Sequence, residues 1–309
     1  MTPKILVTPR SVTTGGHPSL EALKAAGFQV VFCTPGKQPG EDELIRLLPG
    51  CAGYLAGVEP ITAWVLESAA DLRVISRNGV GIDNIDLDAA QRRGIRILRA
   101  ETANTEGVAE LAVGLMFALA RSIPFSDRAL KAGQWQRRKG IELAGRTLGL
   151  LGCGRIGRRV TEIVLGLGMK VLAYDVYPDP AFKPAPHFRY TSLAEVLERS
   201  DVISLHSPAQ PENRPLIDAA ALARMKKGSL LINTARASLI DNQALAAALD
   251  RGQLAGAAVD VFDAEPPADR RLIAGDRLIA TPHVGGYTDE SVDRAVTVAV
   301  ENLLEYLAE

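Results

Sequence analysis

The sequence is poor in cysteine and carries no surplus of charge of either sign. Its three cysteines, Cys33, Cys51 and Cys153, are scattered and form no CxxC pair. This pattern argues against a disulfide framework and against a cysteine-ligated zinc site, so we expect no metal centre. It also favours a reducing, cytoplasmic location.

Charge is almost balanced, with 35 lysines and arginines against 36 aspartates and glutamates, for a formal net charge of −1. The composition therefore gives no electrostatic reason to expect nucleic acid or an anionic membrane as a partner. Residues 1–10 start directly with a strand-like run, so we expect no secretory signal peptide. The longest apolar helix candidate, residues 108–120, is shorter than a bilayer span. We expect a small molecule as the main partner.

What the sequence does contain is a regular alternation of short apolar runs with helical segments. The 309 residues are enough for two domains of ordinary size, each with its own core. In the first third, the expected strands cover residues 4–8, 28–32, 52–56, 73–76 and 94–98. The expected helices between them cover residues 19–26, 41–48 and 62–68. Such alternation predicts an α/β fold with a parallel sheet, whose ligands gather at the carboxyl ends of the strands.

The same alternation resumes after a long helix expected at residues 106–121, which is apolar on most of its faces. The later strands are expected at residues 148–151, 171–174, 201–205, 229–233, 256–261 and 276–280. The later helices are expected at residues 193–198, 219–225, 242–250 and 291–307. The chain therefore reads as two similar α/β halves, each a doubly wound parallel sheet.

The hexapeptide GCGRIG at residues 152–157 lies between an expected strand and an expected helix. Gly152 allows a tight turn, Gly154 allows the backbone to approach a pyrophosphate, and Gly157 allows close packing of helix and sheet. Asp175 ends the next strand, where a carboxylate can accept hydrogen bonds from ribose hydroxyls. A glycine-rich turn alone is weak evidence, but strand, helix, second strand and acid in this order favour a dinucleotide site.

Three polar residues follow strands in the second half, namely Arg236, Glu265 and His283. Hydride transfer to or from a nicotinamide requires a proton donor on the reacting oxygen, which histidine provides near neutral pH. An arginine can hold a carboxylate bidentately, and a carboxylate bonded to the imidazole sets its tautomer. Taken singly, each residue is more often a surface charge, a turn residue or a loop histidine. At neighbouring strand ends they favour a catalytic set.

Several motifs together resemble the D-isomer-specific 2-hydroxyacid dehydrogenases, and phosphoglycerate dehydrogenase-like members in particular. The motifs are GCGRIG, NTAR ending at Arg236, AEPP containing Glu265, PHVGG containing His283, RNGVGIDNIDL at residues 77–87 and the helix VAELAVGLMFALAR at residues 108–121. The resemblance implies that Arg236, Glu265 and His283 are the catalytic residues and that the cofactor is NAD. It also implies an NAD-dependent hydride transfer between a D-2-hydroxy acid and its 2-keto counterpart.

The resemblance further implies a Rossmann-type NAD-binding domain inserted in a flavodoxin-like substrate domain. The NAD-binding domain is expected at residues 100–286, and the substrate domain at residues 1–99 plus 287–309. In the family the long helix at residues 106–121 commonly helps to form a dimer, so we expect a homodimer through the NAD-binding domain.

The same resemblance implies which residues contact the ligands. The implied cofactor contacts are Gly152, Gly154, Arg155, Ile156, Gly157, Asp175, Ser207, Thr234, Ala235, Asp260, Gly285 and Gly286. The implied substrate contacts are Arg236 and His283 together with Asn78, Gly79 and Val80, whose backbone N–H groups would form a nest for a carboxylate. His206 is expected to line the adenosine side of the cofactor through backbone and packing.

The sequence departs from phosphoglycerate-specific relatives in the loop at residues 54–59, which lacks their arginine and contains Glu59. A carboxylate there is expected to repel a phosphate. Reduction of hydroxypyruvate or glyoxylate is therefore an alternative to oxidation of a phosphoglycerate. An alternative of another class is an NAD-sensing binding protein, although such a protein does not need the set formed by Arg236, Glu265 and His283.

Overall fold

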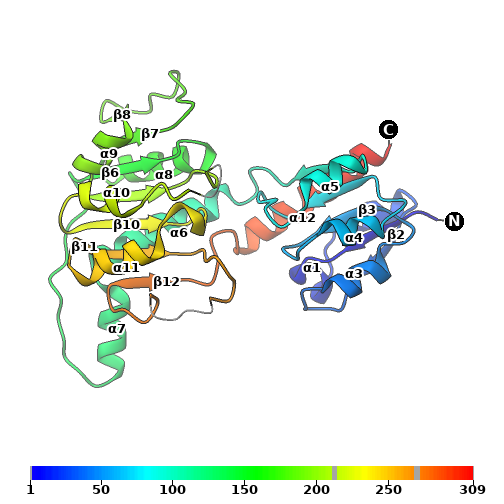
Figure 1. The fold of residues 1–309 in the computed structure, drawn as a ribbon, viewed down its shortest axis with the longest axis horizontal. Helices are drawn as coiled ribbons and strands as arrows, with labels where there is room; N and C mark the ends of the chain where they lie inside the picture. The colour runs from blue at the N-terminus through cyan, green and yellow to red at the C-terminus, as the bar shows by residue number, and fades with distance from the viewer. Residues whose placement is uncertain (1, 211–213, 268–271, 309) are drawn as a thin grey trace. The chain divides into compact units, whose positions relative to one another are not determined.

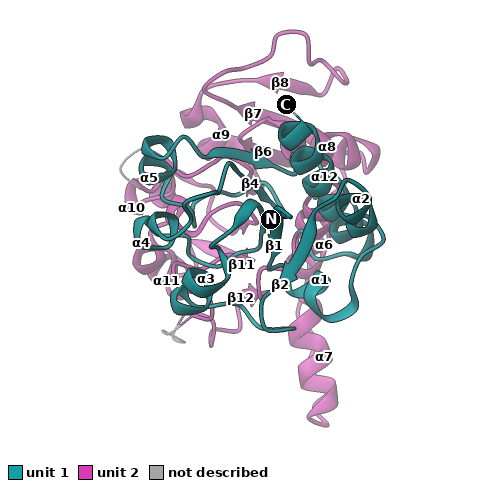
Figure 2. Ribbon diagram, turned by 90° about the vertical axis from the view of Figure 1, so that its right-hand side faces the viewer, with its two compact units in different colours: residues 1–104, 286–309 teal, residues 105–285 magenta. Residues whose placement is uncertain are grey.

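The computed structural model describes residues 2–210, 214–267 and 272–308, and it divides the chain into two α/β units (Figure 1). Unit 1 comprises Met1–Asn104 and Gly286–Glu309, and unit 2 comprises Thr105–Gly285 (Figure 2). The chain therefore enters unit 2 once and leaves it once. The boundaries expected from the sequence, at residues 99/100 and 286/287, lie a few residues from these breaks.

Unit 1 is built on a five-stranded parallel sheet with strand order β2-β1-β3-β4-β5. Its strands are β1 (Lys4–Val7), β2 (Gln29–Phe32), β3 (Cys51–Ala56), β4 (Val74–Arg77) and β5 (Arg96–Arg99). Its helices are α1 (Arg10–Gly15), α2 (Leu20–Ala25), α3 (Glu41–Leu47), α4 (Ala63–Glu67), α5 (Leu87–Arg92) and α12 (Asp289–Ala308).

The strand pleat sends successive side chains of β1 to opposite faces of this sheet. Ile5 and Val7 pack in a core with α2 and α12, whereas Leu6 packs in a separate core with α3, α4 and α5. The C-terminal helix α12 returns from the end of the chain to complete the first core, through residues such as Val300. Unit 1 is therefore a doubly wound sheet with helices on both faces.

Unit 2 is built on a seven-stranded parallel sheet with strand order β12-β11-β10-β9-β6-β7-β8. Its strands are β6 (Thr147–Leu151), β7 (Lys170–Tyr174), β8 (Phe188–Tyr190), β9 (Val202–Leu205), β10 (Ser229–Asn233), β11 (Leu254–Val259) and β12 (Leu278–Ala280). Its helices are α6 (Thr105–Ala120), α7 (Ile123–Lys131), α8 (Arg155–Gly166), α9 (Leu193–Arg199), α10 (Ala219–Arg224), α11 (Asn242–Asp250) and the 3₁₀ turn η2 (Ala237–Leu239).

Two cores sandwich the sheet of unit 2. One contains residues of α6 and α8, such as Met116 and Val160, and the other contains residues of α9, α10 and α11, such as Leu222 and Leu245. The doubly wound parallel arrangement predicted from the sequence is confirmed for both units. Because all strands run parallel, their carboxyl ends meet at one edge of each sheet, and this edge positions the candidate site.

Three helices and one strand were not expected from the sequence, namely α1, α5, α7 and β8. Each of these helices contributes few side chains to a core: Val12 from α1, Ala89 and Ala90 from α5, and Ala129 from α7. The six-residue helices α1 and α5 are too short to show the apolar periodicity that identifies a helix, whereas the nine-residue α7 is amphipathic. Tertiary context and local caps, such as Asp86 accepting the N–H of Ala89 before α5, stabilise them instead.

The long apolar helix α6 is buried along much of its length, and residues such as Ala112 and Met116 have no exposed surface. In the described part of the chain, no single helix is long and apolar enough to cross a membrane. The pair α6 and α7, taken together with a 61° bend between them, passes that test by length and composition. Figures 1 and 2 both show α7 projecting from the rest of unit 2.

Candidate active site at the carboxyl edge of unit 2

The glycine-rich turn joins β6 to α8, and two of its glycines are required by close backbone contacts. Gly152 has φ +96°, and a Cβ there would lie 2.6 Å from the backbone of His206 and Ser207. A Cβ on Gly157 would lie 2.2 Å from the carbonyl oxygen of Gly152. A Cβ on Gly154, by contrast, would meet no protein atom within 4 Å. The face of Gly154 is thus open to a ligand at the start of α8, as a dinucleotide cradle requires.

Asp175 follows β7, and its carboxylate contacts the glycine-rich turn. One carboxylate oxygen accepts the N–H of Cys153 at 2.6 Å, and the other accepts the N–H of Tyr177 at 2.8 Å. These bonds hold the carboxylate beside the turn. Because each carboxylate oxygen can accept more than one hydrogen bond, Asp175 can still accept donors from a ribose.

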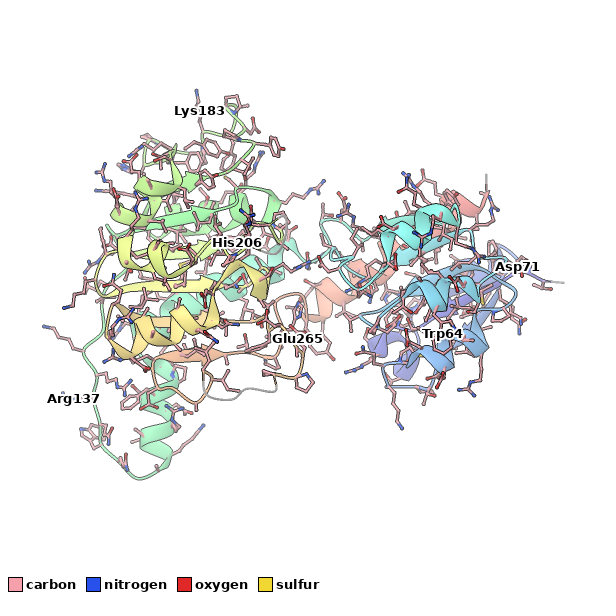
Figure 3. All side chains as sticks on the ribbon, viewed as in Figure 1. Trp64, Asp71, Arg137, Lys183, His206 and Glu265 are labelled. Atoms are coloured by element: carbon pink, nitrogen blue, oxygen red, sulfur yellow. The ribbon has the colours of Figure 1, made fainter. Side chains whose placement is uncertain are left out.

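Buried polar atoms near this turn have no partner among the described residues. They include Nδ1 of His206, Oγ of Ser207 and Oγ1 of Thr234, at the ends of β9 and β10. Nε2 of His206 contacts Oγ of Ser204 at 2.8 Å, and burial lowers the pKa of His206 to about 4 (labelled in Figure 3). Since unpaired buried polar atoms are costly, their concentration at this edge fits a polar ligand such as a dinucleotide.

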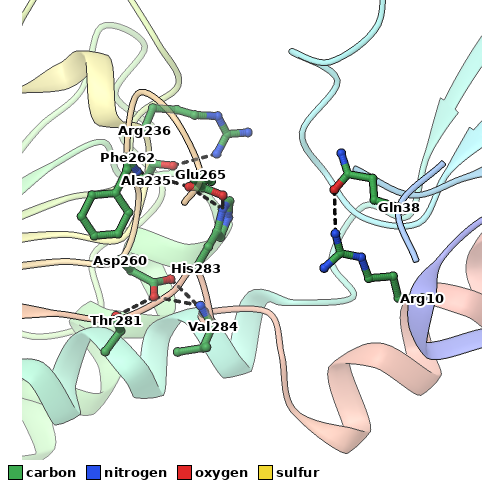
Figure 4. A network of polar contacts seen from close by, with 11 residues as sticks. Arg10, Gln38, Ala235, Arg236, Asp260, Phe262, Glu265, Thr281, His283 and Val284 are labelled. Atoms are coloured by element: carbon green, nitrogen blue, oxygen red, sulfur yellow. Dashed lines mark hydrogen bonds and ion pairs between the residues drawn. The ribbon is translucent and has the colours of Figure 1, made fainter. Parts of the chain in front are cut away.

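Glu265 and His283 follow the neighbouring strands β11 and β12, and the structure brings their side chains together (Figure 4). Nδ1 of His283 lies 2.8 Å from Oε2 of Glu265. Oε1 of Glu265 also accepts the N–H of Phe262 at 3.2 Å, which orients the carboxylate. Both side chains are partly exposed, at 50% for His283 and 40% for Glu265. Because Glu265 occupies Nδ1, Nε2 is the nitrogen that can reach a substrate.

Asp260, at the end of β11, holds the turn that carries His283. Its buried carboxylate accepts the hydroxyl of Thr281 at 2.6 Å and the N–H groups of Val284 and Gly285, each at 2.8 Å (Figure 4). His283 has φ +52°, a left-handed conformation that is uncommon for residues other than glycine. The resemblance implied a cofactor contact for Asp260. The positioning of the His283 turn was not foreseen, because its partners lie more than 20 residues away.

Arg236 follows β10, the strand beside β11, with an extended backbone. The amide of Asn233 closes this turn by donating to the carbonyl of Arg236 at 2.8 Å and accepting the N–H of Ala235 at 3.0 Å. The Arg236 guanidinium donates to the carbonyl of Ala235 at 2.7 Å. Because β10, β11 and β12 are adjacent and parallel, Arg236, Glu265 and His283 lie at one edge of the sheet (Figure 4).

The remaining predicted cofactor residues have distinct positions. Arg155 and Ile156 begin α8, directly after Gly154. Gly285 is buried, and a Cβ there would lie 3.1 Å from Oδ2 of Asp260. Gly286 falls on the far side of the break, in unit 1, and a Cβ there would lie 3.2 Å from Cβ of Asn104.

The structure pairs two of the three backbone N–H groups that were expected to form a nest at Asn78, Gly79 and Val80. The N–H of Asn78 donates to the carbonyl of Ala56 at 2.8 Å, which extends the ladder between β3 and β4. The N–H of Gly79 donates to the carbonyl of Arg77 at 2.8 Å in a tight turn. Two of the three expected donors are therefore already paired within the chain.

The expectation that Glu59 repels a phosphate is also revised. Its side chain is buried, with 1% of the residue exposed, and it accepts hydrogen bonds from Thr8, from Tyr54 at 2.5 Å and from the N–H of Gly57 at 2.9 Å. The carboxylate therefore serves as an internal anchor of its loop. Its charge is directed to these donors instead of to a ligand.

The residues of unit 2 fit a bound NAD. Gly154 and the start of α8 would face the pyrophosphate, Asp175 would face a ribose, and Ser207 and Thr234 offer polar atoms that lack protein partners. The described residues contain no cluster of three or more His, Cys, Asp or Glu side chains that could hold a metal ion.

The family model described as D-isomer specific 2-hydroxyacid dehydrogenase, NAD binding domain, matches residues 113–285. A hydroxypyruvate reductase of Thermotoga maritima is 38% identical over 273 residues, which cover 86% of this chain and 88% of that relative. A D-3-phosphoglycerate dehydrogenase of Methanocaldococcus jannaschii is 42% identical over 250 residues, covering 80% of this chain. The aligned part is 48% of that enzyme, so the chain spans about half the length of this relative.

The crystal structure of the TT0316 protein from Thermus thermophilus has a TM-score of 0.88 with this chain at 37% identity, covering 99% of this chain and 97% of that one. The region matched by the family model contains the glycine-rich turn, Arg236, Glu265 and His283. Because the family model, the relatives and the geometry of unit 2 agree, the chain belongs to the D-isomer-specific 2-hydroxyacid dehydrogenases, a family of NAD-dependent oxidoreductases.

Proposed function

We propose that the chain interconverts a D-2-hydroxy acid and its 2-keto acid with NAD(H), and that Arg236, Glu265 and His283 carry out the reaction. The observation that carries this proposal is the pair formed by Glu265 and His283, with Nδ1 2.8 Å from the carboxylate. Glu265 and His283 follow β11 and β12. The same sheet contains β6, which leads into the glycine-rich turn that fits a dinucleotide. A proton donor and a nucleotide cradle at one sheet edge are what hydride transfer to a carbonyl requires.

Each residue has a defined role in the direction of reduction. Bound NADH supplies the hydride that the carbonyl carbon receives. Nε2 of His283 donates a proton to the carbonyl oxygen, which thereby becomes the hydroxyl. Glu265 accepts a hydrogen bond from Nδ1–H of His283, which fixes the tautomer and the orientation of the ring so that Nε2 faces the substrate. Arg236 holds the substrate carboxylate with its guanidinium fork.

The decisive measurement is NADH oxidation with a panel of 2-keto acids, comparing the wild type with His283→Gln. We expect kcat to fall by about 10²- to 10⁴-fold in His283→Gln, the usual contribution of a general acid. NADH affinity, measured by fluorescence titration, should stay within about threefold, since the glycine-rich turn is untouched. His187→Gln, a change at an exposed histidine, is the matched control and should retain full activity.

Near-normal turnover by His283→Gln would contradict the proposed role. A wild-type chain that binds NADH but oxidises it with no 2-keto acid would support the alternative of an NAD-sensing binding protein.

Among substrates, our first candidate is the 3-phosphoglycerate and 3-phosphohydroxypyruvate pair, in line with the relatives named D-3-phosphoglycerate dehydrogenase. Hydroxypyruvate or glyoxylate is the second, in line with the relative named hydroxypyruvate reductase.

We also propose that unit 1 binds the substrate and that the enzyme is a homodimer through unit 2. Support for the dimer comes from the apolar side chains that α7 and the following segment expose: Ile123 at 52%, Leu130 at 60% and Trp135 at 84%. Ile123 and Leu130 also line a shallow pocket with Arg121, which a second copy can cover.

A cytoplasmic location belongs to the same proposal and is supported by three free, buried cysteines.

A further inference from the structure

Arg10 lies at the carboxyl edge of the unit 1 sheet, in the segment that follows β1. In this sheet β1 lies directly beside β3, and β3 lies beside β4, all parallel. The segments that follow these strands therefore share one edge. Thr8, Pro9 and Arg10 follow β1, while Gly57 follows β3. Gly57 has no side chain, so β3 contributes no cation at this edge, whereas Arg10 follows β1 and Arg77 ends β4.

The guanidinium of Arg10 is exposed and oriented by a neutral group. Its Nη2 donates to Oε1 of Gln38 at 3.0 Å, as Figure 4 shows. Among the described residues no carboxylate forms an ion pair with Arg10. An arginine has five N–H donors, and one bond to an amide leaves its positive charge intact. Arg10 is therefore oriented while its charge stays available for an anion.

The buried carboxylate of Glu59 holds the backbone segment that precedes Arg10. The hydroxyl of Thr8 donates to this carboxylate, and the N–H of Gly57 donates to Oε1 of Glu59 at 2.9 Å and to Oγ1 of Thr8 at 3.1 Å. A Cβ on Gly57 would lie 3.4 Å from Cα of Pro9. The end of β1 and the loop after β3 are thus fastened together immediately before Arg10. A cation on a fixed backbone loses less entropy on binding an anion than one on a mobile loop.

We propose that Arg10 binds an anionic group of the substrate, separate from the 2-keto carboxylate, and so determines substrate specificity. The group is a phosphate or a second carboxylate, because the guanidinium fork matches the oxygens of either one. This inference rests on the proposed function, in which unit 1 binds the substrate. It also explains how the chain can accept such a substrate without an arginine in the loop at residues 54–59.

The test compares Arg10→Gln with wild type on substrates that differ only in the distal group. The probes are 3-phosphohydroxypyruvate, oxaloacetate and 2-ketoglutarate as anionic members, and hydroxypyruvate as the uncharged member. We expect Arg10→Gln to raise KM for at least one anionic substrate by roughly 10- to 100-fold, the usual effect of losing a charged hydrogen bond. For hydroxypyruvate both kcat and KM should stay within about threefold. Which anionic substrate responds distinguishes a phosphate from a carboxylate.

Two further variants separate a binding role from a structural one. Arg10→Lys keeps the charge but loses the fork, so it should restore part of the affinity. Arg92→Gln removes an exposed arginine at the end of α5, the helix that leads into β5, and should change neither parameter. Calorimetry gives a readout that does not depend on turnover. It measures the binding of D-3-phosphoglycerate, of D-malate with its second carboxylate, and of D-glycerate as the ligand without a distal anion, each to the NADH-free protein.

The outcomes are distinguishable. Equal losses on hydroxypyruvate and on all anionic substrates, or no loss on any, would overturn the role of Arg10 while leaving the proposed function intact. Wild-type protein that reduces no 2-keto acid would overturn the proposed function. In that case calorimetry with D-3-phosphoglycerate and with D-malate still decides the inference, because a binding role for Arg10 predicts that at least one of these two ligands binds more weakly to Arg10→Gln than to wild type. Identical binding to both proteins would overturn it.

Discussion

Glu59 and Asp260 are both buried carboxylates that hold loops. Glu59 accepts three donors from its own unit, and Asp260 accepts three donors around the turn that carries His283. A buried carboxylate is tolerated when its oxygens are paired in this way. At the scale of single residues, the candidate site therefore depends on side chains that position the catalytic groups as well as on those groups themselves.

His206 makes the stability of the chain sensitive to acid. Burial lowers its folded-state pKa to about 4 from 6.5. Because the folded pKa is depressed, the unfolded chain takes up the proton first as the pH falls. The contribution of neutral His206 is thus fully present above pH 6.5 and is lost as the pH falls from 6.5 toward 4.

We expect the unfolding free energy of the wild type to fall between pH 7 and pH 5 by about 1–2 kcal/mol more than that of His206→Asn. Urea unfolding at both pH values measures this difference. Any loss common to both proteins comes from other groups and cancels in the comparison. An equal fall in the two proteins would show that His206 is not held neutral by burial.

At the scale of elements, the proposed cofactor site depends on the glycine-rich turn between β6 and α8 together with α8 itself. Gly157→Ala would place a Cβ 2.2 Å from the carbonyl oxygen of Gly152, and backbone cannot move aside as a flexible side chain can. We expect a loss of about 1–3 kcal/mol in unfolding free energy, as for other overpacked sites. NADH affinity should fall at least about tenfold, since displacement of α8 moves its N-terminal N–H groups.

Gly166→Ala, in the same helix, is the matched control, because a Cβ there meets nothing within 4 Å. It should leave NADH affinity unchanged and raise stability slightly, since alanine favours a helix more than glycine does. Urea unfolding and NADH fluorescence titration measure both variants. Similar behaviour of the two variants would mean that the close approach at Gly157 does not control the cofactor site.

At the scale of the whole molecule, the projecting helix α7 and the segment after it are the proposed dimer surface. Figure 3 shows Arg137 in the segment that leads from α7 back to β6. Arg128 and Arg138 both pair with Asp276, so this segment is fastened to unit 2 at its base. A surface that is both apolar and held in place is suited to a permanent interface.

We expect light scattering to give a mass near twice 33.0 kDa for the wild type. Replacing both Leu130 and Trp135 with Asp should give the monomer mass, since two charges would be buried without partners. Trp64→Asp is the matched control at the other tryptophan of the chain, which is 55% exposed on α4 of unit 1, and it should remain dimeric. A wild-type monomer, or a double variant that stays dimeric, would contradict the proposed interface.

Much of the fold follows from local patterns in the sequence. Each strand of the two sheets except β8 overlaps a predicted strand, and the turn at residues 152–157 joins the predicted strand and helix. The convergence of Glu265 and His283 also follows, because polar residues after adjacent parallel strands meet at one edge. Short helices such as α1 and α5 do not follow, since few of their side chains enter a core.

The sequence by itself determined the fold class, the position of the dinucleotide site and the residues expected to carry out hydride transfer. These depend on periodicity and on the order of motifs along the chain. Only the tertiary structure decided that Glu59 is an internal anchor, that Asn78 uses its N–H group within the chain, and that Arg10 is oriented by the amide of Gln38. Those properties depend on partners that are distant in sequence, such as Thr8 and Glu59, which are 51 residues apart. Burial and hydrogen-bond partners are set by such long-range contacts, which a local pattern does not contain.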